Sequence, residues 1–135
     1  MQRPRDPLMI RAYRAVALIM LVLVLVQAVS AGRFLAYFET NAMDLHRAIA
    51  NVVSIVVLAE VILAFAAGFS PQLRLPAWTS SLVVLMIAQT AVGYAGRDRP
   101  NFASLHVPLG VLVFGVSMLV TVLAFFDTTE REAEP

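Results

Sequence analysis

The sequence predicts an all-α integral membrane protein, an up-down four-helix bundle built from two parallel helical-hairpin repeats. Of its 135 residues, 60% are hydrophobic and only 14% are charged, and the mean hydropathy is +0.81. A soluble domain carries roughly 25% charged residues, so the composition favours the lipid bilayer. Four apolar runs, each with the ~20 residues that a helix needs to cross the hydrocarbon core, give the number of helices. The last two runs repeat features of the first two.

Short polar segments rich in proline, glycine and arginine separate the apolar runs. The runs predict one membrane domain, residues 15–126, with spanning helices at about 15–32, 43–69, 77–95 and 102–126. A basic segment, residues 1–14, precedes this domain, and its Pro4 and Pro7 disfavour a helix there. An acidic tail, residues 127–135, follows the last run.

The first apolar run has a second interpretation as a secretory signal peptide. Val29-Ser30-Ala31 resembles the small-residue site at which such peptides are cleaved. The apolar core is long for a signal peptide, however, and the run has a counterpart later in the chain. We therefore favour a membrane helix.

Arginine counts predict the orientation, because cytoplasmic segments of membrane proteins carry an excess of positive charge. All ten basic residues are arginine, and six fall on the side of the N-terminus: Arg3, Arg5, Arg11, Arg14, Arg74 and Arg131. The other side holds Arg33, Arg47, Arg97 and Arg99. Because four arginines cluster ahead of the first run, we expect a multi-pass protein of the plasma (inner) membrane with both termini in the cytoplasm.

The two halves of the chain share a stretch that begins with leucine and histidine. Leu45–Ala50 reads Leu-His-x-x-Ile-Ala, and Leu105–Gly110, sixty residues later, reads Leu-His-x-x-Leu-Gly. A glutamine precedes each histidine, by 19 residues at Gln27 and by 17 at Gln89. Hairpins repeated in the same orientation are related by an axis along the membrane normal. The repeat thus predicts both histidines at one depth near the outer surface, on diagonal helices.

His46 and His106 are the only histidines in the chain, and they are candidate axial ligands of one haem. Each has a small residue four positions on, Ala50 or Gly110, which is expected to leave room beside the imidazole. Ionisable side chains inside a membrane are costly and tend to mark function. Two histidines suit haem iron better than zinc or copper, which require more protein ligands. Ordinary hydrogen bonding to backbone, water or headgroups remains the alternative.

Other polar side chains accompany the histidines. Gln27 and Gln89 are candidate donors to the haem edge, or ordinary hydrogen-bond partners between helices. Arg47 and Arg97 stand at the outer mouth, where guanidinium groups pair with propionates or act as interface anchors. Glu60 follows His46 by 14 residues on the same face, ~21 Å deeper. Glu60 is either a functional group on the side of the protein that handles protons or quinone, or a neutral carboxyl that is hydrogen-bonded to a neighbour such as Ser117.

Around the two leucine-histidine stretches, the chain resembles two related groups of membrane proteins. One is an uncharacterised family of small bacterial four-helix proteins with Leu-His-x-x-x-Gly at the start of helix four. The other is one half of haem A synthase, whose halves each carry haem-ligating histidines on their second and fourth helices. The resemblance covers residues 15–126 and implies His46 and His106 as ligands. Met43 stands where the synthase has a glutamate and only one half is present, so the resemblance does not extend to haem A synthesis.

The sequence thus predicts a b-type membrane cytochrome that holds one haem b for electron transfer or as a subunit of a larger complex. The alternative is a cofactor-free accessory subunit that acts through helix packing with a partner, and a homo-oligomer is compatible with both. No nucleophile–base pair, phosphate loop or nucleotide fingerprint is present, which argues against an enzyme. Four helices with one buried acidic side chain provide little lining for a transport pathway, which argues against a transporter. With no cysteine and a net charge of +1, iron–sulfur clusters and nucleic-acid partners are not expected.

Overall fold

The computed structural model describes residues 6–127, apart from the side chains of residues 100 and 103. The chain forms α1 (Pro7–Tyr37), α2 (Thr40–Ala66), the short 3-10 helix η1 (Pro71–Leu73), α3 (Leu75–Ala95) and α4 (Pro100–Phe126). Each of the four α-helices is long and apolar enough to cross a membrane. The prediction of an all-helical chain with four membrane-spanning helices is therefore confirmed.

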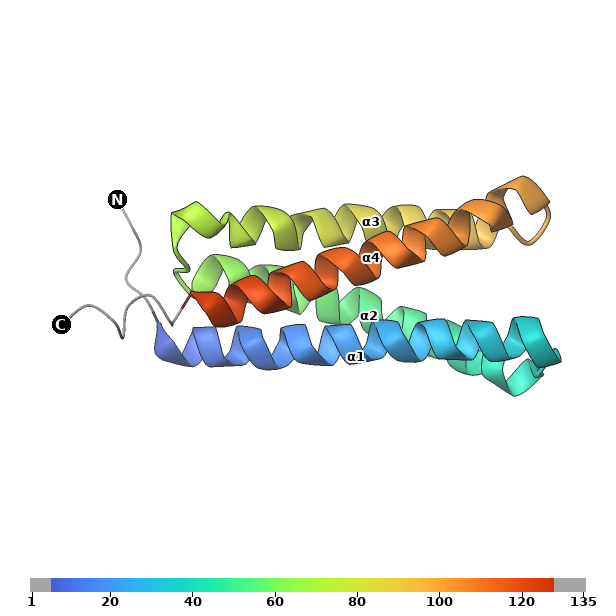
Figure 1. Cartoon of the computed structure of the whole chain (residues 1–135), viewed down its shortest axis with the longest axis horizontal. Helices are drawn as coiled ribbons and strands as arrows, with labels where there is room; N and C mark the ends of the chain where they lie inside the picture. The colour runs from blue at the N-terminus through green and yellow to red at the C-terminus, as the bar shows by residue number, and fades with distance from the viewer. Residues whose placement is uncertain (1–5, 128–135) are drawn as a thin grey trace.

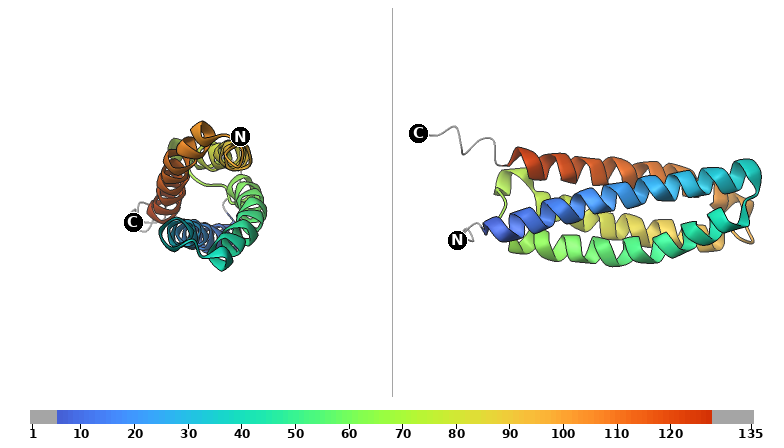
Figure 2. Two further views of the ribbon diagram at one scale, coloured as in Figure 1. Left: turned by 90° about the vertical axis from the view of Figure 1, so that its right-hand side faces the viewer. Right: turned by 90° about the horizontal axis from the view of Figure 1, so that it is seen from below.

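The four helices lie along one axis, and each packs mainly against two neighbours (Figures 1 and 2). Helix α1 packs against α2 and α4, and α3 packs against the same two helices. Helices α2 and α4 consequently face each other diagonally across the bundle. We call the end that holds the α1–α2 and α3–α4 connections the hairpin end. The opposite end, where α1 begins and α4 finishes, is the terminal end.

Helix α1 begins earlier than the apolar pattern predicts, and the expectation that Pro7 disfavours a helix is wrong. The Asp6 side chain accepts hydrogen bonds from the backbone N–H groups of Leu8 and Met9, at 2.9 and 3.3 Å, and so caps the helix. Pro7 is the first helical residue, where its missing N–H removes no helical hydrogen bond. Pro4 lies outside the described residues.

A hydrogen-bonded arginine joins α1 to α4 at the terminal end. The Nε and Nη2 atoms of Arg14 donate to the backbone carbonyl oxygen of Ala124, at 3.0 and 2.9 Å. Carbonyls in the last turn of a helix have no partner within the helix, and a cation there also complements the helix dipole. The guanidinium in addition lies 5.0 Å from the centre of the Phe125 ring. This contact holds the two termini of the membrane domain at one end.

The middle of the bundle interior is apolar, with side chains from all four helices. These buried side chains, which we call the apolar middle layer, are Met20, Val53, Val57, Leu82, Met86 and Val113. Large apolar side chains also cover the outside, such as Val84, which is 67% exposed. Because lipid tails are as apolar as these residues, close packing rather than burial from water stabilises the interior.

Replacing Leu82 tests this packing. Leu82 is completely buried, so Leu82→Ala should leave a cavity and lower the free energy of unfolding by about 2 kcal/mol or more. Val84→Ala, two residues along the same helix but facing outward, is the control and should change stability much less. Unfolding of both variants in mixed micelles measures the difference, and equal losses would contradict the assigned orientation of α3.

Candidate functional site

The two histidines meet in the bundle interior near the hairpin end. His46 lies six residues into α2 and His106 six residues into α4, so each is ~9 Å from the start of its helix. The ring centres are 6.1 Å apart, and the ring planes form an angle of 65°. Both side chains are half-buried. The diagonal placement of α2 and α4 thus brings together two residues that are 60 positions apart in sequence.

A hydrogen bond to α1 fixes the His46 ring. Its Nδ1 atom lies 3.0 Å from the backbone carbonyl oxygen of Gln27, which can only accept. Nδ1 must therefore carry the proton, and in the neutral ring the lone pair is on Nε2. The Ser30 hydroxyl donates to the same carbonyl at 3.0 Å and lies 3.5 Å from Nδ1. Metal-binding histidines commonly donate their second ring N–H to a backbone carbonyl in this way.

The His106 ring contacts the side chain of Gln89 on α3. The Gln89 amide nitrogen lies 3.3 Å from His106 Nε2. In this orientation the buried atoms Gln89 Oε1 and His106 Nδ1 have no hydrogen-bond partner. Rotating the amide by 180° exchanges the positions of its oxygen and nitrogen. Nε2–H then donates to Oε1, and the lone pair of the ring is on Nδ1.

A glycine makes room for the His106 ring, but it is not the glycine that the sequence pattern suggests. A Cβ atom at Gly93 would lie 2.9 Å from His106 Cε1 and 3.2 Å from Nδ1. At Gly110 the nearest atom is instead Gln89 Nε2, at 3.3 Å, so the space beside Gly110 accommodates the glutamine. Sequence reasoning did not assign Gly93 to the site. Gly93 follows Gln89 by four residues and therefore lies on the same face of α3, which is the feature of the sequence that could have indicated its role.

For the other side chains that the sequence suggested, no hydrogen bond to the two histidine rings is found among residues 6–127. The Gln27 side-chain oxygen is buried without a hydrogen-bond partner, and Ala50 is half-buried on α2. Arg47 is exposed and bonds to Asp44 at 3.3 Å. Arg97 is also exposed, and its guanidinium lies 4.4 Å from the centre of the Tyr94 ring. Both arginines thus have partners at the surface of the hairpin end.

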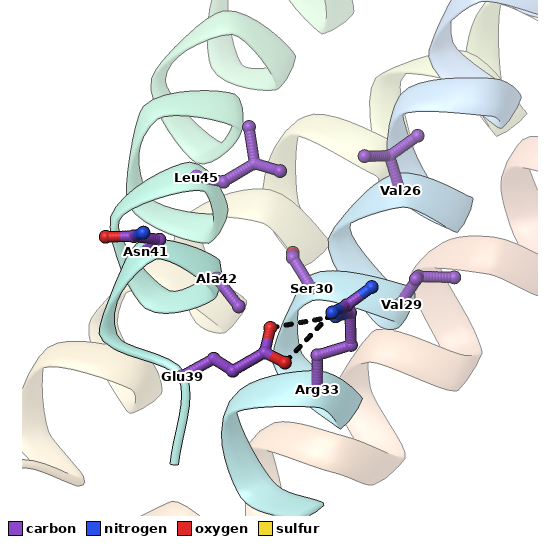
Figure 3. A pocket seen from close by; sticks show the side chains of 8 residues that line it. All are labelled: Val26, Val29, Ser30, Arg33, Glu39, Asn41, Ala42 and Leu45. Carbon is purple, nitrogen blue, oxygen red and sulfur yellow. Dashed lines mark hydrogen bonds and ion pairs between the residues drawn. The ribbon is translucent and has the colours of Figure 1, made fainter. Parts of the chain in front are cut away.

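A groove of about 340 Å³ opens between α1 and α2 at the hairpin end (Figure 3). It is lined by Val26, Val29, Ser30, Arg33, Glu39, Asn41, Ala42 and Leu45. Arg33 and Glu39 form two hydrogen bonds of 2.9 Å across it, and the guanidinium holds the pKa of the Glu39 carboxyl below its usual value. Ser30, one of the lining residues, also lies 3.5 Å from His46 Nδ1.

Glu60 does not form the hydrogen bond that we considered with Ser117. Glu60 is completely buried in α2 and Ser117 is buried in α4. Both carboxyl oxygens of Glu60 and the Ser117 hydroxyl lack hydrogen-bond partners. The sequence places each residue on an inward face but does not fix the rotation of diagonal helices relative to each other. Glu60 therefore belongs to a different part of the interior from the histidines.

The donor set at the histidine pair is small. Within residues 6–127, no three histidine, cysteine or acidic side chains come together as a metal site. The pair offers two imidazole nitrogens and no carboxylate. Such a set suits a metal that brings most of its ligands with it, as haem iron does.

No family model, curated protein or solved structure matches this chain. The resemblance at the two leucine-histidine stretches therefore stays a prediction.

Gly93→Ala tests the space around His106. The added methyl group would lie 2.9 Å from the ring, so we expect the imidazole to move and stability to fall by about 1–3 kcal/mol. Gly32→Ala is the control, because no atom lies within 4 Å of a Cβ at that position. Because the chain has only two histidines, NMR of ¹⁵N-histidine protein resolves each ring. An unchanged His106 signal in Gly93→Ala would contradict the packing described.

The same spectra test the protonation of His46. We expect neutral His46 to carry its proton on Nδ1, because the Gln27 carbonyl accepts from that atom at 3.0 Å. The ¹⁵N shifts and proton couplings of the ring distinguish this form from the Nε2–H form. His106→Gln, which leaves one histidine, assigns the signal. A dominant Nε2–H form of His46 would show that the hydrogen bond to α1 is absent.

Proposed function

We propose that the chain is a small b-type cytochrome of the plasma (inner) membrane, with one haem b held between His46 and His106. The observation that supports this is the 6.1 Å separation of the ring centres. A metal–imidazole bond is about 2 Å long and a ring nitrogen lies about 1 Å from the ring centre, so two imidazoles on one metal have centres about 6 Å apart. Porphyrin supplies four nitrogens, and two histidines complete the coordination of haem iron.

Unpartnered polar atoms around the rings also support a bound group. Gln27 Oε1 and His106 Nδ1 are buried without hydrogen-bond partners. Such atoms are rare in folded proteins because each one loses its hydrogen bonds to water. Binding to haem iron would give the His106 nitrogen a partner, and polar substituents of the haem could give a hydrogen bond to Gln27 Oε1. These unpartnered atoms therefore support the proposal of a bound cofactor.

When bound, haem iron supplies one-electron redox chemistry, and the residues of this chain position it. The Gln27 carbonyl orients the His46 ring, and Gln89 orients the ring of His106. Gly93 leaves His106 the space that it needs. The apolar middle layer, which lies below the histidines, keeps water out of the interior on that side.

The proposal includes the construction and orientation of the bundle. We take the chain to be two equivalent hairpins in an up-down bundle, with the haem near the outer face and both termini in the cytoplasm. Each hairpin supports this, because a glutamine of its first helix contacts the histidine of its second helix. The electron partner would be a redox protein or a larger membrane complex. The relation to haem A synthase depends on the two leucine-histidine stretches alone.

An absorption spectrum of purified protein reconstituted with haem tests the proposal. We expect a Soret band in the oxidised protein and sharp α and β bands after reduction with dithionite, as low-spin iron with two histidine ligands gives. His46→Ala and His106→Ala should each lose the low-spin spectrum, because one axial nitrogen is removed.

Leu105→Ala is the matched control for these variants. It alters the neighbour of His106, and Leu105 points outward with 52% exposure. The control should keep the full spectrum. A featureless wild-type spectrum after addition of haem would contradict the proposal and favour the cofactor-free subunit.

A further inference from the structure

A second group of polar side chains lies in the bundle interior, near the terminal end. It comprises one residue from each helix, namely Tyr13, Glu60, Thr79 and Ser117, and we call it the polar layer. All four are at most 1% exposed. Tyr13 lies six residues after the start of α1 and Glu60 six residues before the end of α2, so each is ~9 Å from the terminal end.

The hydrogen bonds of the polar layer have a definite direction. The Thr79 hydroxyl donates to the backbone carbonyl oxygen of Leu75 at 2.9 Å. Its proton is then not available to Tyr13, whose hydroxyl lies 2.7 Å from Thr79 Oγ1 and must be the donor of that bond. The Tyr13 oxygen thus keeps its lone pairs for another donor. Glu60 is the neighbour close enough to interact with it electrostatically.

Among residues 6–127, no cation is found to balance a negative charge on Glu60. On α1, the titratable side chain that faces Glu60 is Tyr13. The neighbouring Arg14 hydrogen-bonds to a backbone carbonyl of α4. The only charged or titratable side chain in α3 is Tyr94, and the only one in α4 is His106. Both lie toward the hairpin end. Neither carboxyl oxygen of Glu60 has a hydrogen-bond partner. An ionised carboxylate without a partner in such an interior is very unfavourable.

We infer that Glu60 is a proton-binding site of the bundle interior, in which the carboxyl carries a proton and turns to donate it to the Tyr13 oxygen, a hydrogen bond that is absent from the present side-chain orientation. A metal cation fits less well. The unpartnered side-chain oxygens of the polar layer belong to Glu60 and Ser117 and number three, whereas hard cations such as Ca²⁺ take six or more. A proton needs one oxygen to hold it and one acceptor. This inference does not depend on haem.

The proton reaches Glu60 from the terminal end. The polar layer lies ~9 Å from that end and ~21 Å along α2 from His46. The apolar middle layer fills the interior between the two sites. It has no side chain that could pass a proton toward the histidines.

Infrared spectroscopy of the full chain in lipid, without added haem, tests the inference at pH 7. The difference spectrum between wild type and Glu60→Gln should contain the carbonyl band of a protonated carboxylic acid, and this band should shift in D₂O. Glu39→Gln is the control, because exposed Glu39 pairs with Arg33 as a carboxylate and its loss should leave the acid band unchanged. Tyr13→Phe should shift the band, since it removes the acceptor oxygen.

The experiment has two outcomes that would overturn the inference. Absence of an acid band that depends on Glu60 would mean that the carboxyl is ionised. Loss of the band on addition of Na⁺ at constant pH would mean that the site binds a metal cation in place of the proton. If Glu60→Gln does not fold, Glu60→Asp should keep the band at an altered frequency. Because no haem is present, neither result depends on the outcome of the haem experiment.

Discussion

Every polar group inside a membrane protein must find its partner within the protein, because lipid offers none. In this chain the helices satisfy most of their own backbone hydrogen bonds, Pro108 inside α4 being an exception, and the interior polar side chains gather at two depths. One group surrounds the histidines near the hairpin end, and the other surrounds Glu60 near the terminal end. The apolar middle layer separates them. Each of the four helices is rotated about its own axis so that its polar side chains point into the interior at one of these two depths.

In each hairpin a glutamine of the first helix contacts the histidine of the second helix, but through different atoms. In the first hairpin the backbone carbonyl of Gln27 contacts the imidazole, whereas in the second the Gln89 side chain does so. Gly93 adjoins the His106 ring, while Gly32, five residues after Gln27, has no atom within 4 Å of where a Cβ would lie. A side-chain amide takes up more interior space than a shared carbonyl, and Gly110 supplies that space in α4. Equivalent sequence positions therefore do not have equivalent contacts.

Composition and the length of the apolar runs were sufficient to predict the four membrane helices, because both follow from the thickness of the bilayer. Local rules failed at Pro7, whose effect on the helix depends on the cap that Asp6 provides. The histidines could be paired because a sequence repeat linked them. The spacing of Gly93 from Gln89 indicated a shared face of α3, but its contact with His106 and the bond between Tyr13 and Thr79 depend on how the helices are rotated about their axes. Periodicity shows which face is apolar, but not which side chains of diagonal helices touch.

The separation of the two sites limits how strongly one can influence the other. Two unit charges ~21 Å apart interact by only about 0.8 kcal/mol at an effective dielectric constant of about 20, which corresponds to a roughly fourfold change in affinity. An electron on the proposed haem would therefore alter proton binding at Glu60 only modestly. Strong coupling of the two events would require the helices to move, and the close packing of Met20, Leu82 and their neighbours opposes such movement. The architecture accordingly favours two sites that work separately near opposite ends of one bundle.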